Sequence, residues 1–317
     1  IELARVAAIH NGRYVSHLRD EDDRFVDANG IQLRYQTWGQ SRPGEPALVF
    51  IHGFANSLQS FNRIGPLLAD DYQVIALDMP GFGLSDKPVD HDYSNPAQAQ
   101  VVADFIAALE LDKVVIGGHS MGATVALLAA GARPDKVAGL VLVDPVILPA
   151  RYYMGMHLSP FRRGGHHMAK QARRRRNKFD SREHIQFKYK GRGAFTTWRE
   201  PFLEDYILDA FDRTDGNDPD SDKQVWQLLC DPKWEAATLM AQRNRPWGAL
   251  AKVRKHQIPI TVLRPDRDSV MTDEVAARLT KKCPHLVLKE RVNTTHFLPM
   301  EAPYDVRDQL SSYISSL

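Results

Sequence analysis

The feature that most constrains the fold is a series of short, nearly continuous apolar runs. They occupy residues 47–51, 74–77, 114–116, 139–143 and 258–263. Strands of a parallel sheet are buried on both faces, so they read as continuous stretches of Val, Ile and Leu. Between and after these runs the sequence favours helices near residues 97–110, 120–132, 272–282 and 302–316. The alternation predicts an α/β protein with a mostly parallel sheet covered by helices.

Before the first of these runs, the sequence predicts a β-hairpin. Residues 24–27 and 31–35 alternate between apolar and polar positions on either side of the turn dipeptide Asn29-Gly30. Residues 1–23 end in four consecutive acidic residues, and we expect them to form a solvated N-terminal lead-in.

The alternation of strands and helices stops once, from about residue 145 to residue 253. Irregular stretches of this length are uncommon inside a compact domain. We therefore expect a mostly helical cap at residues 148–253, inserted into a core that residues 24–147 and 254–317 form.

The overall composition is that of an ordinary globular protein, with 43% hydrophobic and 25% charged residues and a net charge of +2. This balance gives no global field that would favour nucleic acid or a membrane surface. No apolar run has the length of a transmembrane helix. Cys230 and Cys283 are isolated and are expected to be reduced thiols. A cytoplasmic location is the default expectation, and a cleaved signal peptide stays open because the chain begins at Ile1 rather than Met.

Charge is nevertheless concentrated within the expected cap. Residues 162–192 hold twelve Lys and Arg against Asp180 and Glu183, and they include the run Arg173-Arg174-Arg175-Arg176. Residues 204–222 carry eight acidic residues. We expect the two stretches to pair largely with each other, with an anionic ligand or surface as the alternative and nucleic acid as the least favoured partner. The oligomeric state is left open.

The strongest chemical motif is Gly-His-Ser-Met-Gly at residues 118–122. It lies directly between the predicted strand 114–116 and the predicted helix that follows. A strand-to-helix turn this sharp strains the central residue and exposes its hydroxyl at the edge of the sheet, and small residues on either side make room for it. The start of the helix stabilises negative charge that develops there. We expect Ser120 to be a nucleophile, supported by Gly118 and Gly122.

A serine hydroxyl is a weak nucleophile and needs a base that takes its proton. Among the twelve histidines, His296 lies in a short loop between a predicted strand at 286–288 and the last helix, at the same sheet edge as Ser120. His52 and His119 also lie near the motifs. Each, however, is the chain neighbour of a residue on which the backbone conformation of the site depends. We therefore expect His296 to be the base and these two histidines to be supporting residues.

The third member of such a site is an acid that orients the imidazole. Asp268, Asp266 and Asp144 all come just after predicted strands, and the chain order of serine, acid and histidine allows each of them. Asp268 is our favoured acid, with Asp266 and Asp144 as alternatives.

Acyl transfer also needs N–H donors for the oxyanion of the tetrahedral intermediate. Met121, the residue after the nucleophile, supplies one backbone N–H. A second is expected from Phe54 in the loop after the strand 47–51, where Gly53 permits the turn.

Several motifs together resemble the α/β-hydrolase superfamily, in particular members with a cap such as esterases and carbon–carbon bond hydrolases. They are the segment from His52 to Phe54, the segment from Asp78 to Asp86, the motif around Ser120, the segment from Pro265 to Asp268 and the segment from His296 to Pro303. The resemblance covers about residues 24–147 and 254–317. It implies an eight-stranded, mostly parallel sheet with the cap inserted after the sixth strand. It also favours Asp268, since the acid of the family usually follows a glycine by three residues here, although this chain has Pro265 at that position.

The residues and the resemblance together predict a serine hydrolase that cleaves a carboxylic ester of a small to medium, partly hydrophobic substrate through an acyl-enzyme. A hydrolase of carbon–carbon bonds next to a ketone would use the same triad and stays open. A ligand receptor with the same fold and slow or no turnover is the alternative from another class. Dehalogenases and epoxide hydrolases of this fold carry Asp at the nucleophile, so Ser120 argues against both. The triad generates its own nucleophile, so no metal or organic cofactor is implied.

Overall fold

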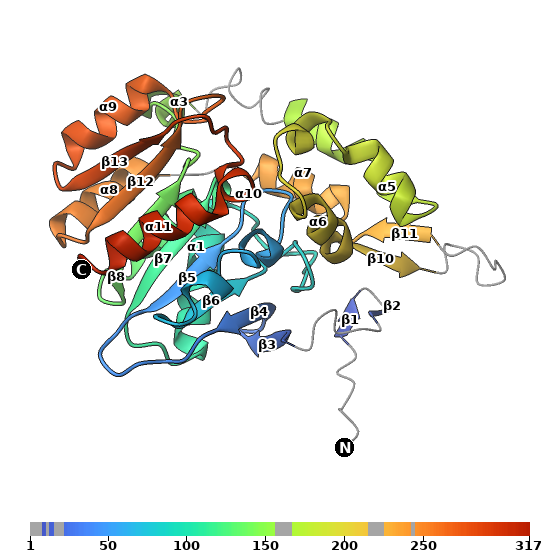
Figure 1. The fold of residues 1–317 in the computed structure, drawn as a ribbon, viewed down its shortest axis with the longest axis horizontal. Coiled ribbons are helices and arrows are strands. Elements are labelled where there is room, and N and C mark those ends of the chain that lie inside the picture. The colour runs from blue at the N-terminus through green and yellow to red at the C-terminus, as the bar shows by residue number, and fades with distance from the viewer. Residues whose placement is uncertain (1–7, 11–12, 16–21, 156–166, 215–224, 242–244) are drawn as a thin grey trace.

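An eight-stranded sheet forms the centre of the molecule (Figure 1). The computed structural model describes residues 8–10, 13–15, 22–155, 167–214, 225–241 and 245–317. The strands lie in the order β13-β12-β8-β7-β5-β6-β4-β3. In chain order they are β3 (Arg24–Asp27), β4 (Gln32–Trp38), β5 (Ala47–Ile51), β6 (Val74–Leu77), β7 (Val114–His119), β8 (Val137–Val143), β12 (Ile260–Pro265) and β13 (Leu286–Arg291).

The direction of the strands agrees with the prediction of a mostly parallel sheet. All neighbouring pairs from β13 to β6 are parallel, whereas β4 is antiparallel to both β6 and β3. The β3–β4 pair is the predicted hairpin, with Asn29 and Gly30 both at positive φ in the turn. The carboxyl ends of the parallel strands therefore meet along one edge, and the loops after them can form a common site.

Two layers of helices cover the sheet. Alternate residues of the buried strands enter different apolar clusters: Val49 and Ile51 face one side, and Leu48 and Phe50 face the other. The first side is covered by α1 (Asn95–Ala108), α2 (Met121–Ala132), α8 (Pro246–Lys255) and α9 (Asp273–Lys282). The second side is covered by the 3-10 helices η1 (Leu58–Phe61) and η2 (Pro66–Leu68), with α10 (Leu298–Glu301) and α11 (Pro303–Ile314).

Helix α8 belongs to the core, although the division made from the sequence places most of it in the cap. Its Ala249, Leu250 and Val253 are buried in the same apolar cluster as α2. The approach is close, because a Cβ added at Gly131 of α2 would lie 2.9 Å from the Cα of Ala249. We therefore call residues 148–245 the inserted segment.

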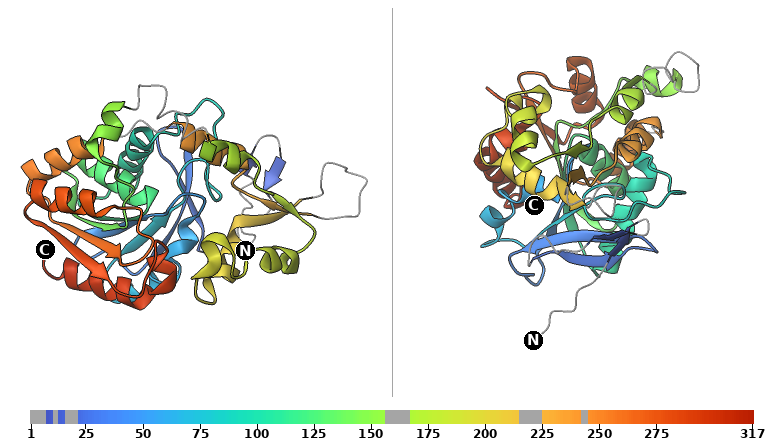
Figure 2. Two further views of the ribbon diagram at one scale, coloured as in Figure 1. Left: turned by 90° about the horizontal axis from the view of Figure 1, so that it is seen from above. Right: turned by 90° about the vertical axis from the view of Figure 1, so that its right-hand side faces the viewer.

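Most of the inserted segment stands beside the sheet, on the right in Figure 1 and in the left view of Figure 2. Its described helices are α3 (Ala150–Gly155), residues 167–173, α5 (Arg182–Tyr189), η3 (Gly193–Thr196), α6 (Phe202–Ala210) and α7 (Pro232–Met240). It also holds a small antiparallel sheet, which the sequence analysis did not predict. Its strands are β9 (Lys178–Phe179), β10 (Phe211–Thr214) and β11 (Val225–Leu228), in the order β10-β11-β9. The lead-in likewise contains an unpredicted hairpin of β1 (Ala8–His10) and β2 (Arg13–Val15).

A buried arginine joins the inserted segment to the core. Arg34 of β4 donates to Asp23 at 2.7 Å, to Asp78 at 3.3 Å and to Asp209 of α6 at 2.7 Å, and its side chain is only 1% exposed. Asp209 also accepts a hydrogen bond from the Ser57 hydroxyl, in the loop that follows β5. Burial raises the pKa of Asp23 within this group. Helix α6 is thus held against the core by an ion pair that is almost fully buried.

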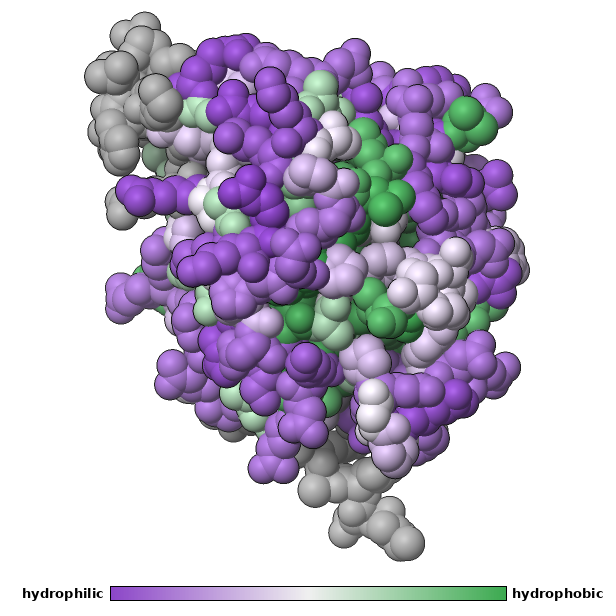
Figure 3. All heavy atoms as spheres, turned by 90° about the vertical axis from the view of Figure 1, so that its left-hand side faces the viewer, coloured by the Kyte–Doolittle hydropathy of each residue, from purple (hydrophilic) through white to green (hydrophobic). Residues whose placement is uncertain are grey.

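The far edge of the sheet is a strand protected by charge. Beyond Leu286, β13 carries Lys289, Glu290 and Arg291, and charged edge strands resist pairing with other chains. The face of the molecule on this side is mostly hydrophilic, and its larger apolar patches lie near its middle (Figure 3). None of the helices in the described ranges has the length and apolar character needed to cross a membrane. Cys230 and Cys283 are free and buried.

Candidate active site

Ser120 lies at the sharp turn between β7 and α2, as the motif predicts. Its backbone has φ 56° and ψ −118°, a conformation that L-residues rarely adopt. The turn is held from two sides, because the Ser120 N–H donates to Val143 at 2.9 Å and its carbonyl accepts from the Thr124 N–H at 3.3 Å. Ser120 is 7% exposed, so only a small part of its surface meets solvent.

The two glycines of the motif are required by close backbone approach. A Cβ at Gly118 would lie 2.4 Å from the carbonyl oxygen of Gly122, and one at Gly122 would lie 2.2 Å from that of Ile51. Real Cβ atoms do not come this near to backbone oxygen, so both positions exclude larger residues. The β5 end, β7 and the start of α2 therefore pack tightly around the serine.

His296 lies against Ser120, although 176 residues separate them. Its Nε2 is 2.9 Å from the Ser120 Oγ, and its Nδ1 is 2.7 Å from Oδ2 of a carboxylate, that of Asp144. A carboxylate facing Nδ1 fixes the proton on that nitrogen, which leaves Nε2 free to accept from the serine hydroxyl. The loop that carries His296 follows β13, at the predicted edge of the sheet.

The carboxylate beside His296 belongs to Asp144, not to the favoured Asp268. Asp144 directly follows β8, and its N–H donates to the carbonyl of Leu263 at 2.8 Å, so the backbone still pairs with the neighbouring strand β12. This pairing keeps the Asp144 side chain at the sheet edge, fully buried beneath His296. Asp268, in contrast, is exposed at a positive φ of 51° and forms no hydrogen bond with His296 in the described part of the chain.

The loop after β12 supports Asp144 through a different residue. Ser269 donates its hydroxyl to Asp144 Oδ1 at 2.6 Å, and the Val270 N–H donates to Oδ2 at 3.1 Å. Asp266, the other alternative, accepts the N–H groups of Asn293 and Thr294 at 2.9 and 3.1 Å and so shapes the loop that leads to His296. These hydrogen bonds, that from Asn293 first, lower the pKa of Asp266. Sequence reasoning missed Ser269, and only its position beside Asp268 could have pointed to it.

The two expected oxyanion donors come from segments that adjoin the serine: Met121 follows it in the chain, and a Cβ at Gly53, the residue before Phe54, would lie 3.4 Å from the Ser120 Cβ. Met121 is the first residue of α2, and Phe54 follows Gly53 in the loop after β5. Within the described residues, neither backbone N–H donates a hydrogen bond to another group of the protein. The next residue, Ala55, has a positive φ of 58°. Both N–H groups are thus available to a ligand, as the prediction of oxyanion donors requires.

His52 and His119 are buried and neutral, in keeping with supporting roles. His52 accepts from the Met79 N–H through Nε2 at 3.0 Å, and its Nδ1 lies 2.7 Å from the Gly53 carbonyl oxygen. Burial lowers its pKa. The Nε2 of His119 donates to the carbonyl of His296 at 2.6 Å. Burial, and then the nearby His296, lower the pKa of His119 to about 3.

The charged residues of the inserted segment find partners in different parts of the molecule. Arg175 turns inward, where it pairs with Glu235 at 2.5 Å and donates to the Tyr206 hydroxyl at 2.7 Å. From the acidic stretch, Asp205 and Asp209 pair with Arg63 and Arg34 of the core, which differs from the expected pairing within the cap. Arg162, Arg163 and residues 215–222 lie outside the described residues.

No cluster of His, Cys, Asp and Glu among the described residues has the form of a metal site.

The known proteins that this chain resembles agree with the fold. The family model described as "alpha/beta hydrolase fold" matches residues 46–303. The chain belongs to this family.

Individual relatives include hydrolases of different kinds. The uncharacterized hydrolase YugF of Bacillus subtilis is 24% identical over 300 residues, which is 92% of this chain and 97% of that protein. A 2-hydroxy-6-oxo-6-(2'-aminophenyl)hexa-2,4-dienoic acid hydrolase of Metapseudomonas resinovorans is 38% identical over 125 residues, 38% of this chain and 41% of that one. Among solved structures, E-2-(acetamidomethylene)succinate hydrolase superposes with a TM-score of 0.73 over 92% of this chain and 98% of its own, at 20% identity.

Proposed function

We propose that this protein is a serine hydrolase that cleaves a carboxylic ester of a small to medium, partly hydrophobic substrate. The observation that carries the proposal is the hydrogen-bonded series Ser120–His296–Asp144, with separations of 2.9 and 2.7 Å. This order of hydroxyl, imidazole and buried carboxylate is the arrangement that activates a serine for attack on a carbonyl. In this proposal Asp144 is the acid.

The first half-reaction acylates the serine. Ser120 Oγ attacks the carbonyl carbon of the ester while His296 Nε2 takes the hydroxyl proton. The negative oxygen of the tetrahedral intermediate accepts from the N–H groups of Phe54 and Met121. When the carbon–oxygen bond breaks, His296 returns the proton to the leaving alkoxide, and an alcohol departs. Asp144 stabilises the imidazolium that exists between these two proton transfers.

The second half-reaction repeats the chemistry with water. His296 takes a proton from the water that attacks the acyl carbon, and it then returns a proton to Ser120 Oγ as the carboxylic acid leaves. His119 holds the backbone carbonyl of His296 at 2.6 Å, so the base keeps its place in both half-reactions.

Aromatic side chains around His296 support a partly apolar substrate. The ring of Phe297 lies 5.3 Å from that of His296, and the ring of Trp198, from the inserted segment, lies 5.9 Å from that of Phe297. Aromatic walls with few polar groups are typical of pockets for apolar ligand parts. The inserted segment thus acts in this proposal as a cap that contributes to substrate selection.

A second candidate is the hydrolysis of a carbon–carbon bond next to a ketone. It is favoured by the stretch of 38% identity to the 2-hydroxy-6-oxo-6-(2'-aminophenyl)hexa-2,4-dienoic acid hydrolase. The same three side chains would serve this reaction, so only substrates can separate the two.

The test is the steady-state release of p-nitrophenol from short- and medium-chain esters. We expect many turnovers for the native protein and a fall in kcat of at least about a thousandfold for Ser120→Ala. Ser312→Ala, on the exposed face of α11, is the matched control and should leave the rate unchanged. One burst without turnover would favour a receptor instead. If esters are inert but a β-diketone is cleaved to a ketone and a carboxylic acid, the second candidate is correct.

A further inference from the structure

Behind the His296 loop lies a polar cavity that the proposed reaction does not use. It has a volume of about 470 Å³, within the range of small-molecule sites. Four parts of the chain line it: the inserted segment, the end of β12, the end of β13 and the start of the last helices. Neither Ser120 nor His296 is among the lining residues.

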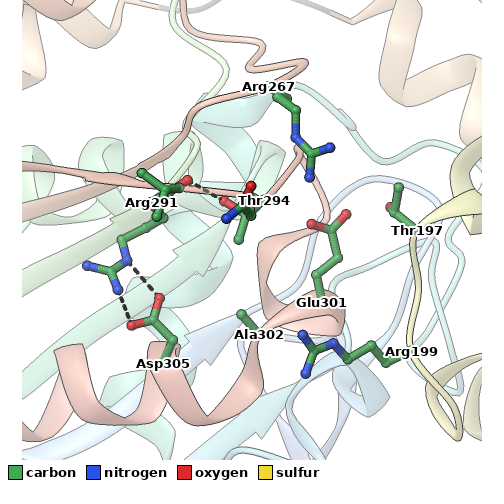
Figure 4. A pocket seen from close by; sticks show the side chains of 10 residues that line it. Thr197, Arg199, Arg267, Arg291, Thr294, Glu301, Ala302 and Asp305 are labelled. Carbon is green, nitrogen blue, oxygen red and sulfur yellow. Dashed lines mark hydrogen bonds and ion pairs between the residues drawn. The ribbon is translucent and has the colours of Figure 1, made fainter.

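Three arginines from these different parts line the cavity. Arg199 comes from the inserted segment, Arg267 follows β12 and Arg291 ends β13 (Figure 4). The carboxylates that line it are those of Glu301 and Asp305. The lining therefore carries one positive charge in excess.

The carboxylates are already engaged by other donors. Asp305 forms a two-pronged ion pair with Arg291, including a bond of 2.7 Å from Nε. The Glu301 carboxylate is buried, and it accepts the N–H of Thr295 at 2.7 Å and the hydroxyl of the same residue. Hence neither acid is free to take a further arginine as its main partner.

Arg199 and Arg267 are left without such a partner. Arg199 is exposed and forms no ion pair with any of the described residues. Arg267 approaches only Asp266, at 3.9 Å, and that carboxylate is already bound by two backbone N–H groups. In Figure 4 Glu301 lies between Arg267 and Arg199, and both arginines line the cavity.

We propose that this cavity binds a phosphate group, as a free phosphate ion or as the phosphate of a small monoester. Each guanidinium can donate two parallel hydrogen bonds to an oxyanion, and phosphate offers enough oxygens for two such forks. The cavity is larger than phosphate alone requires, so it has room for the organic part of a monoester. The ligand would bridge Arg199 of the inserted segment and Arg267 of the core, close to the loop that carries His296.

The test is calorimetric titration with inorganic phosphate and with phenyl phosphate, using the full chain. We expect both to bind, and we expect Arg199→Gln/Arg267→Gln to weaken binding at least tenfold. Arg42→Gln/Arg133→Gln removes the same charge from exposed sites elsewhere and should bind like the native protein. Arg199→Lys/Arg267→Lys keeps the charge but cannot donate paired hydrogen bonds from a guanidinium. Its affinity for phosphate should lie between that of the native protein and that of the double Gln variant.

Further measurements separate this site from the active site. Binding should be unchanged in Ser120→Ala, since that side chain does not line the cavity. The four arginine positions are exposed, and equal melting temperatures will show that the variants fold. Tighter binding of the monoester than of the free ion would identify the source of the phosphate. No binding of either probe, equal binding by the double Gln variant, or tighter binding of succinate would overturn the proposal.

Discussion

The loops after β8 and β12 lie side by side at the same sheet edge, and each begins within a few residues of an aspartate. In the β8 loop, Asp144 is fully buried and bonded to His296. In the β12 loop, Asp268 points into solvent, and Ser269 reaches across to Asp144 instead. One loop thus supplies the carboxylate and the other supplies a donor to it. Two positions that look equivalent in a sequence have become complementary in the structure.

The sharpest test of this difference is Asp144→Asn. An amide in place of the carboxylate favours the wrong imidazole tautomer and no longer stabilises the imidazolium. We expect kcat/KM for ester hydrolysis to fall on the order of 10³–10⁴-fold. Steady-state kinetics on the substrate found by the nitrophenyl ester screen will measure it. A loss of less than tenfold would mean that another acid serves His296.

Ser269→Ala should have the next largest effect. It removes a charge-assisted hydrogen bond of 2.6 Å to Asp144, while the bond from the Val270 N–H remains. A bond of this kind is worth about 1.5–3 kcal/mol. We expect kcat to fall about tenfold, with little change in KM because the hydroxyl acts on Asp144. Ser269→Thr keeps a hydroxyl and should recover most of the rate, and no recovery would point to a packing effect instead.

Asp266→Asn tests the structural part played by the β12 loop. The pKa of Asp266 is lower in the folded state than its ordinary value of 3.8, so its carboxylate stabilises the fold above about pH 4. This stabilisation is lost as the pH falls through the folded-state pKa. Urea unfolding should therefore show a small loss of stability in the variant at pH 7 and a smaller loss at pH 2.5. An equal loss at both values would contradict a role for the charge.

The smallest effect is expected for Asp268→Asn. The side chain is exposed and has no bond to His296, so kcat/KM should stay within about a factor of two of the native value. Measured together with Asp144→Asn, this variant compares the two loops directly. A loss as large as that of Asp144→Asn would show that the loops rearrange when substrate binds.

The sheet and two members of the site could be predicted because their signals are local and strong. Continuous apolar runs report burial on both faces, and the motif around Ser120 needs glycine for steric reasons that the structure makes plain. His296 followed from the rule that parallel strands end at a common edge. That same rule could not choose between Asp144 and Asp268, because it brings every such loop to the edge. The choice depends on the conformation of the two loops. Asp144 (φ 42°) and Asp268 (φ 51°) both have a positive φ, yet Asp144 is buried and Asp268 is exposed.

The small sheet of the inserted segment was missed for a different reason. Strand β9 has two residues, and β10 and β11 have four each. Segments this short carry no measurable periodicity, and their pairing joins positions far apart in the chain. Their apolar residues form a cluster of their own, around Phe179, Tyr206 and Phe211. Such tertiary pairing is not encoded in any local pattern.

The buried Arg34 limits how such proteins can exchange parts. Its guanidinium belongs to the core, but one of its carboxylate partners, Asp209, arrives with the inserted segment. A core that recombined with a foreign segment lacking an acid at this place would lose that partner, and this segment moved to a core without Arg34 would bury Asp209 without its counter-charge. Breaking a buried pair in this way costs about 3–5 kcal/mol, a large share of the stability of an ordinary domain. A change at Arg34 or at Asp209 therefore affects both parts of the chain, and an exchange of either part must supply the missing charge.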